Sequence, residues 1–91
     1  MNILTKKVKI SEQTVAQDVD GEIVLLNLDT EHYYGLDEVG ARLWQLMTAH
    51  EDLHEISVRL QQEYDVLPEL LEADLNRILA KMEQAQLISI L

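Results

Sequence analysis

Residues 21–47 read GEIVLLNLDTEHYYGLDEVGARLWQLM, and this stretch decides the fold. Its first part has the two-residue period of a half-buried β-strand. Its second part has the three- and four-residue spacing of an amphipathic helix. Almost none of its side chains is equipped for catalysis. The stretch therefore predicts a strand that leads directly into a helix, in a small docking module.

Length and composition predict one small domain. The chain has 91 residues, of which 47% are hydrophobic, and it contains no cysteine. That absence excludes disulfides, thiol catalysis, zinc knuckles and iron–sulfur ligation. The N-terminal MNILTKKVKI has no apolar run long enough for a signal peptide or a membrane span, so we expect a soluble cytoplasmic protein. Residues 1–13 are expected to form an N-terminal arm or an extra strand, and residues 14–91 a single domain.

The charge of the chain bears on its partners. The chain has 17 acidic and 7 basic residues, for a formal charge of −10, and three of the bases (Lys6, Lys7 and Lys9) lie near its beginning. From Gln13 onward there are 16 acids and 4 bases. Such a body repels a phosphate backbone and favours cationic or neutral peptide partners. The alternative is that the charge only keeps a small domain in solution.

Turn residues divide the first part of the domain into three strands. Asp20-Gly21 lies between strand-like runs at Thr14–Val19 and Glu22–Leu28, which is a strong hairpin signal. A polar turn follows, and the aromatic pair Tyr33-Tyr34 then favours a short third strand within Glu31–Leu36, at an edge of the sheet. Val8–Ile10 could be an extra strand or a mobile arm.

The helical period begins at the end of the third strand and continues to the C-terminus. The first helix is expected to be capped by Asp37, the second by Glu51 or Asp52, and the third to begin at Pro68. Gly40 lies on the apolar face of the first helix, which suggests a close approach to the sheet. The chain ends in an apolar LISIL tail. The predicted fold is α+β and winged helix-turn-helix-like, with a three-stranded antiparallel sheet followed by three helices.

Motifs for chemistry are weak in this sequence. His50 and His54 have the i,i+4 spacing of a helical metal site, but a helix start between them places the pair across a loop. We therefore expect solvated histidines, with no metal site and no cofactor. There is no phosphate-binding glycine loop and no nucleophile elbow, and no serine has a nearby histidine and acid. Catalysis has no candidate, so a non-enzymatic protein is expected.

Two surfaces favour a binding role. The first is the edge strand Glu31–Leu36, whose unpaired backbone groups can template a partner strand. The second is a line on the third helix formed by Leu70, Asp74, Arg77 and Lys81, with Ile78 beside it. A peptide between these two surfaces would pair with the strand and place alternate side chains against the helix. Otherwise the edge is merely short, and Asp74–Arg77 is only a weak surface ion pair.

The sequence resembles the PqqD-like family, small proteins related to the D component of pyrroloquinoline quinone biosynthesis. The resemblance rests on LLNLDTEHYYGLDEVGARLWQL, on the later EYDV and ADL segments, and covers roughly Thr14–Ile88. It implies a precursor-peptide recognition element for ribosomally synthesised, modified peptides. Such proteins resemble winged helix-turn-helix domains, but a leader peptide adds to their third strand against the third helix. The implied peptide-binding residues are Glu31, His32, Tyr33, Tyr34, Gly35, Asp74, Arg77, Ile78 and Lys81.

The chain departs from the family pattern at particular positions. A frequent glycine in the turn before the third strand is Glu31 here, which bears on the turn geometry. The glycine that usually precedes the final Leu-Ile is Gln86, which bears on the C-cap of the last helix. Where the quinone-pathway member tends to carry Tyr-Pro-Glu-Gly, this chain has residues 27–30, NLDT. It is more similar to the stand-alone, lasso-peptide-type members.

The expected function is to capture a precursor leader and present it to a maturation enzyme such as a leader peptidase, a cyclase or a radical SAM enzyme. No nucleic acid or membrane partner is expected. The alternative is a winged-helix DNA-binding transcriptional regulator, although the third helix offers only Arg77 and Lys81 among several acids. A third hypothesis is a homodimer in which the third strands of two copies pair edge to edge.

Overall fold

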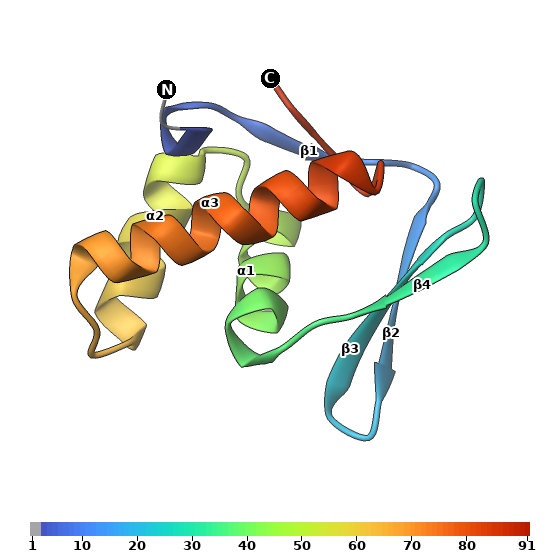
Figure 1. Ribbon diagram of the computed structural model, residues 1–91, viewed down its shortest axis with the longest axis horizontal. Helices are drawn as coiled ribbons and strands as arrows, with labels where there is room; N and C mark the ends of the chain where they lie inside the picture. Colours follow the sequence, from blue (N-terminus) through green and yellow to red (C-terminus); the bar gives the residue numbers. More distant parts are fainter. Residues whose placement is uncertain (1–2) are drawn as a thin grey trace.

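The computed structural model describes residues 3–91 and has an α+β fold, which confirms the predicted fold class (Figure 1). A short 3-10 turn, η1, opens it. Three helices follow four of the strands, and a fifth strand ends the chain. The bounds, in chain order, are η1 Ile3–Thr5, β1 Val8–Ile10, β2 Thr14–Val19, β3 Glu22–Asn27, β4 His32–Gly35, α1 Glu38–Ala49, α2 Leu53–Glu63, α3 Pro68–Gln84 and β5 Ile88–Ile90.

The predicted three-stranded sheet is present, with the antiparallel order β2-β3-β4. Its first turn is the predicted two-residue hairpin. Asp20 and Gly21 both have positive φ, at 54° and 85°, as a type I′ turn requires. The second turn is held by the buried Asn27, whose Oδ1 accepts the Asp29 N–H at 2.9 Å. Because β3 is the only strand that pairs with β4 among the described residues, β4 lies at an edge of this sheet, as predicted.

A second, two-stranded sheet joins the two ends of the chain. Val8–Ile10 forms β1 and pairs antiparallel with β5, with Val8 opposite Ile90 and Lys9 opposite Ser89. The LISIL tail is thus partly a strand, which the prediction of three strands did not include. The physical reason is that the only strand partner of β5 lies at the other end of the described chain. No local sequence pattern reveals pairing between residues so far apart in the sequence.

The three helices begin as predicted. The Asp37 carboxylate accepts the Gly40 N–H at 2.8 Å, the Asp52 carboxylate accepts the His54 N–H at 2.9 Å, and Pro68 is in the first turn of α3. Gly40 was expected to allow a close approach to the sheet. The nearest atoms to a Cβ placed there would be the Asp37 Oδ1 at 3.1 Å and those of Leu36, which follows β4, at 3.6 Å. This glycine makes room for the helix cap.

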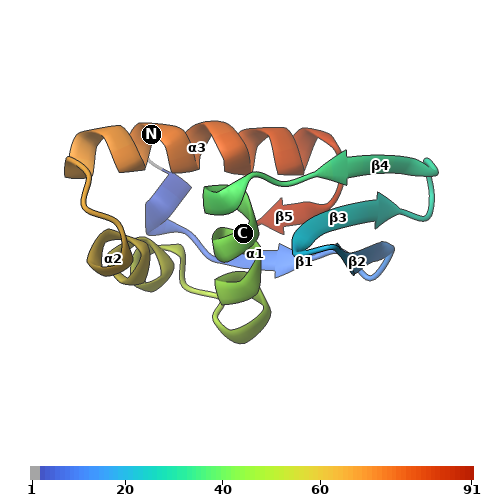
Figure 2. The same ribbon diagram turned by 90° about the horizontal axis from the view of Figure 1, so that it is seen from below.

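One apolar core lies between the helices and the inner faces of the sheets. Its largest fully buried side chains are those of Leu25, Leu43, Leu53, Ile56, Leu60, Leu75, Leu79 and Leu87. The β2–β4 sheet extends away from the helices on one side (Figure 1), and α3 and β4 lie along the same side of the molecule (Figure 2). Among the described residues, no helix is long and apolar enough to cross a membrane.

Candidate functional site

The free edge of β4 offers backbone groups at alternate residues. The Leu36 N–H donates to the Ile23 carbonyl at 3.0 Å. Because antiparallel strands alternate the direction of their backbone groups, Tyr34 is also directed toward β3, and the N–H and C=O of Tyr33 and Gly35 are directed away from it. Within residues 3–91 no further strand pairs with this side of β4. Two residues thus present four hydrogen-bonding groups to a partner.

The side chains of β4 divide between two faces of the sheet. Tyr34 is half-buried and packs against the core on the α3 side, and its ring meets that of His32 edge-on at a centroid distance of 6.5 Å. Tyr33 lies on the outer face, 66% exposed, in register with Leu26 and Val15. A peptide strand added to β4 would alternate in the same way, with every second side chain directed toward α3.

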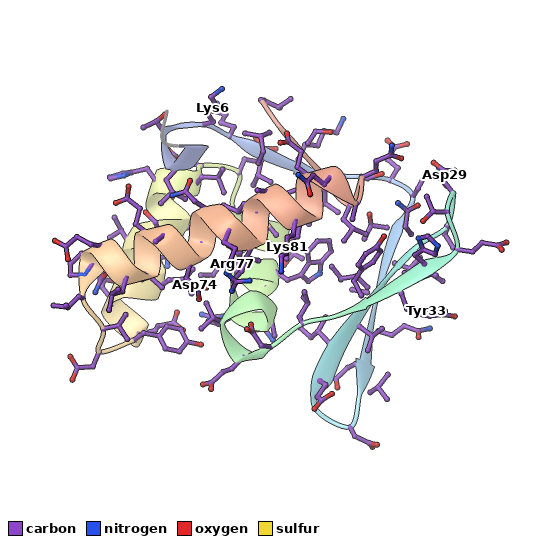
Figure 3. All side chains as sticks on the ribbon, in the orientation of Figure 1. Lys6, Asp29, Tyr33, Asp74, Arg77 and Lys81 are labelled. Atoms are coloured by element: carbon purple, nitrogen blue, oxygen red, sulfur yellow. The ribbon has the colours of Figure 1, made fainter. Side chains whose placement is uncertain are left out.

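α3 forms the wall opposite this edge. The predicted i,i+3 pair is present, since the Arg77 Nε donates to the Asp74 Oδ1 at 3.2 Å. Ile78 is buried, 8% exposed, and belongs to the core. The Asp74, Arg77 and Lys81 side chains follow one another along α3 toward β4, and Lys81 lies nearest the strand (Figure 3).

A cavity of about 250 Å³ lies between β4 and α3. Of the predicted peptide-binding residues, the structure brings together Tyr34, Gly35, Arg77, Ile78 and Lys81 on its walls. Glu31, His32, Tyr33 and Asp74 do not line it. Its other lining residues are Leu36, Asp37, Gly40, Met82 and Leu87.

A second cavity, of about 470 Å³, adjoins the first and has Arg77 in common with it. It lies between α1, the α2–α3 loop and α3, and its lining residues are Val39, Tyr64, Val66, Leu70, Leu71, Ala73, Asp74 and Arg77. Of these, the sequence analysis named only Leu70, Asp74 and Arg77 as candidate binding residues. Val66, Leu67 and Leu70 are exposed apolar residues around Pro68, which is the signal that could have drawn attention to this surface.

An ion pair between helices involves Glu63, the residue before Tyr64 in the wall of this second cavity. Arg42 of α1 donates through Nε and Nη2 to the two carboxylate oxygens of Glu63 at 2.7 and 2.9 Å. The hydrogen bonds from Arg42 lower the pKa of Glu63, and the same bonds raise the pKa of Arg42. Burial, followed by the negative charges of Glu38 and Glu63, raises the pKa of Tyr64. The pair joins the end of α2 to α1 next to Tyr64.

The two positions at which the chain departs from the family glycines are left-handed in the structure. Glu31 has φ 62° and Gln86 has φ 60°. Glycine adopts such conformations readily, whereas other residues adopt them at a cost. The Glu31 N–H donates to the Asn27 carbonyl at 2.7 Å, which closes the turn before β4. Both residues therefore hold a backbone conformation that the glycine expected from the resemblance would adopt without strain.

The three histidines lie on different elements. His50 ends α1, with its Nδ1 3.7 Å from Glu55, while His54 is in the first turn of α2 and His32 is on β4. Among the described residues there is no group of three or more His, Cys, Asp or Glu side chains that could hold a metal ion.

Comparison with known proteins relates this arrangement to peptide recognition. The sequence profile of a family described as coenzyme PQQ synthesis protein D (PqqD) matches residues 22–88. A solved structure of TbiB1 in complex with the TbiA(beta) leader peptide is 37% identical, with a TM-score of 0.83, over 89% of this chain and 94% of that one.

A second solved structure has the same fold at lower identity. It is lasso peptide synthetase B1 complexed with the leader peptide, 19% identical, with a TM-score of 0.77 over 90% of this chain and 96% of that one. A search of curated proteins gave no match.

Proposed function

This chain belongs to the PqqD family, and we propose that it binds the leader segment of a ribosomally made precursor peptide by strand addition to β4. The observation that carries this proposal is the unpaired edge of β4 above a cavity whose other wall is α3. The similarity to TbiB1, whose solved structure contains a leader peptide, supports it. The resemblance of the sequence to stand-alone, lasso-peptide-type members suggests the same kind of precursor for this chain.

The arrangement supports a role for each predicted peptide-binding residue. Tyr33 and Gly35 would supply backbone groups, and Tyr34, Ile78, Arg77 and Lys81 would contact side chains directed toward α3. Glu31 and His32 would flank the strand, and Asp74 would hold Arg77 in place through their ion pair. Backbone hydrogen bonds would provide affinity for many sequences, and the cavity would provide selectivity.

The protein would act as a non-catalytic carrier. It would hold the leader while a maturation enzyme, such as a leader peptidase, a cyclase or a radical SAM enzyme, works on the core segment. Tethering of that kind raises the local concentration of substrate without chemistry by the carrier. We assign recognition to residues 14–91 as one domain, with residues 1–13 contributing β1 to the second sheet.

The winged-helix DNA-binding alternative is not favoured. α3 carries only two basic residues, Arg77 and Lys81, and Arg77 is already paired with Asp74. A recognition helix needs clustered bases to meet phosphates. The free β4 edge could also pair with β4 of a second copy, and a leader would then compete with that homodimer for the same backbone groups.

Substitution at Gly35 tests the proposal. Proline at this position removes the outward N–H, and its closing ring occupies the edge. Alanine keeps the N–H, and a Cβ there meets nothing within 4 Å. With the TbiA(beta) leader peptide as the probe, we expect Gly35→Ala to bind as the wild type does. We expect Gly35→Pro to bind at least about tenfold more weakly, from the loss of a hydrogen bond of about 1 kcal/mol and the added steric block.

A matched proline at the opposite edge is the control. Ala16 of β2 also directs its backbone away from β3, so Ala16→Pro makes the same chemical change at the other free edge. Calorimetric titration of the three variants, with thermal unfolding to check that each is folded, gives the comparison. Equal affinity of folded Gly35→Pro and Gly35→Ala would contradict strand addition to β4.

A further inference from the structure

Lys81 is a cation without a partner in the wall of the β4–α3 cavity. Within residues 3–91 it takes part in no ion pair, whereas Arg42, Arg59 and Arg77 each have a carboxylate partner. Helix neighbours at i±3 and i±4 are the ones that can form such pairs. For Lys81 they are Arg77, Ile78, Gln84 and Ala85, and none of them is acidic.

Lys81 differs from Arg77 and Asp37, the other charged residues that line the cavity, because each of those two already has a polar partner. Arg77 is paired with Asp74. Asp37 also lines the cavity, and its carboxylate accepts the Gly40 N–H. Lys81 has no such partner among the described residues, and it lines the cavity together with the apolar side chains of Ile78, Met82 and Leu87. An acidic group would be repelled near Asp37 and attracted near Lys81. The cavity thus has a negative group at Asp37 and, among the described residues, an unpaired positive group at Lys81, in a chain whose net charge is −10.

The strand register brings a peptide side chain toward Lys81. A strand bonded to Tyr33 and Gly35 has its residue opposite Tyr34 on the α3 side, because side chains alternate. Tyr34 and Lys81 line the same cavity, and Lys81 is the labelled α3 side chain nearest β4 (Figure 3). The residues of the added strand that face α3, at and around this position, are the ones within reach of the ammonium group.

We propose that Lys81 makes the groove selective for a peptide strand with a carboxylate side chain at the α3-facing position nearest Lys81. This inference rests on the proposed function, since it assumes a peptide strand on β4. The methylenes of Lys81 would cover the apolar lining while its ammonium group meets the carboxylate at the rim. Acidic side chains elsewhere on the protein would repel acidic residues at other positions of the peptide. The charge of Lys81 would therefore fix the register of the bound peptide as well as its preferred residue.

A charge-exchange experiment tests this. The probe is the TbiA(beta) leader peptide, prepared as a panel in which each position in turn is Glu, Gln or Lys. Affinities are measured by fluorescence anisotropy for the wild type, Lys81→Gln and Lys81→Glu. Lys6→Glu is the matched control, because it makes the same change in net charge near the N-terminus, away from β4 (Figure 3).

The expected result is one α3-facing position at which Glu binds the wild type about three- to tenfold more tightly than Lys, as a partly exposed ion pair allows. The preference should disappear in Lys81→Gln, reverse in Lys81→Glu, persist in Lys6→Glu and weaken as salt is added. If the panel binds and no position changes its preference with Lys81, the inference is wrong and the proposed function stands. If no panel member binds the wild type, the proposed function fails and the inference fails with it.

Discussion

Glu31 and Gln86 are single residues that hold the left-handed backbone conformation usually supplied by glycine. Gln86 follows the C-cap of α3 in a Schellman arrangement: the Leu87 N–H donates to the Met82 carbonyl at 3.0 Å, and the Gln86 N–H to the Glu83 carbonyl at 3.0 Å. This motif usually has glycine at the left-handed position. Gln86 therefore keeps the hydrogen bonds of this C-cap at the cost of left-handed strain.

Gln86→Gly is expected to stabilise the protein. Relief of the left-handed strain exceeds the extra flexibility of glycine in the unfolded chain, so the free energy of unfolding should rise by about 0.5–1 kcal/mol. Urea denaturation measures the change. Ala85→Gly is the control, because Ala85 has φ −80° and carries no such strain. A gain for Ala85→Gly as large as that for Gln86→Gly would contradict the explanation.

At the scale of elements, local signals predicted the most. Asp20-Gly21, the Asp37 and Asp52 caps and Pro68 each act within one turn of chain, and each was predicted correctly. The β1–β5 sheet depends on contact between the two ends, which no short pattern encodes. The same limit applies to the site. The β4 edge and the Asp74–Arg77 pair could be predicted, but the cavity beside Tyr64 needs α1 packed beside the α2–α3 loop.

The ion pair between α1 and α2 predicts a dependence of stability on pH. The pKa of Glu63 is lowered from its ordinary value of 4.5 in the folded protein, mainly by the hydrogen bonds from Arg42. Stability from this group is therefore present above pH 4.5 and is lost as pH falls through the lowered pKa. The melting temperature of the wild type should exceed that of Glu63→Gln at pH 7, and the gap should narrow below about pH 4.5.

Glu12→Gln is the control for that series. Glu12 is an exposed carboxylate outside the ion pairs found among residues 3–91. It removes the same charge, so it accounts for the general effect of titrating an acidic protein. A gap between the wild type and Glu63→Gln that stays constant from pH 7 to pH 3 would show that the Arg42–Glu63 pair contributes nothing.

At the scale of the whole molecule, the described residues leave the outer edge of β4 unpaired beside the cavity between β4 and α3. The helices, the core and the β1–β5 sheet hold α3 and β4 along one side (Figure 2), and the negative charge disfavours nucleic acid there. The stretch that decides the fold, residues 21–47, contains β3, β4 and most of α1. Its strand-to-helix transition thus positions β4 and Leu36 against the cavity, which links the fold directly to the proposed binding edge.

Amide hydrogen exchange at β4 tests strand addition most directly. Leu36 and Tyr34 direct their backbone toward β3 in the free protein, whereas the N–H groups of Tyr33 and Gly35 face outward. With saturating TbiA(beta) leader peptide, followed residue by residue by NMR, exchange should slow strongly at Tyr33 and Gly35 and change little at Tyr34 and Leu36. Bound leader with unchanged exchange at Tyr33 and Gly35 would contradict the account.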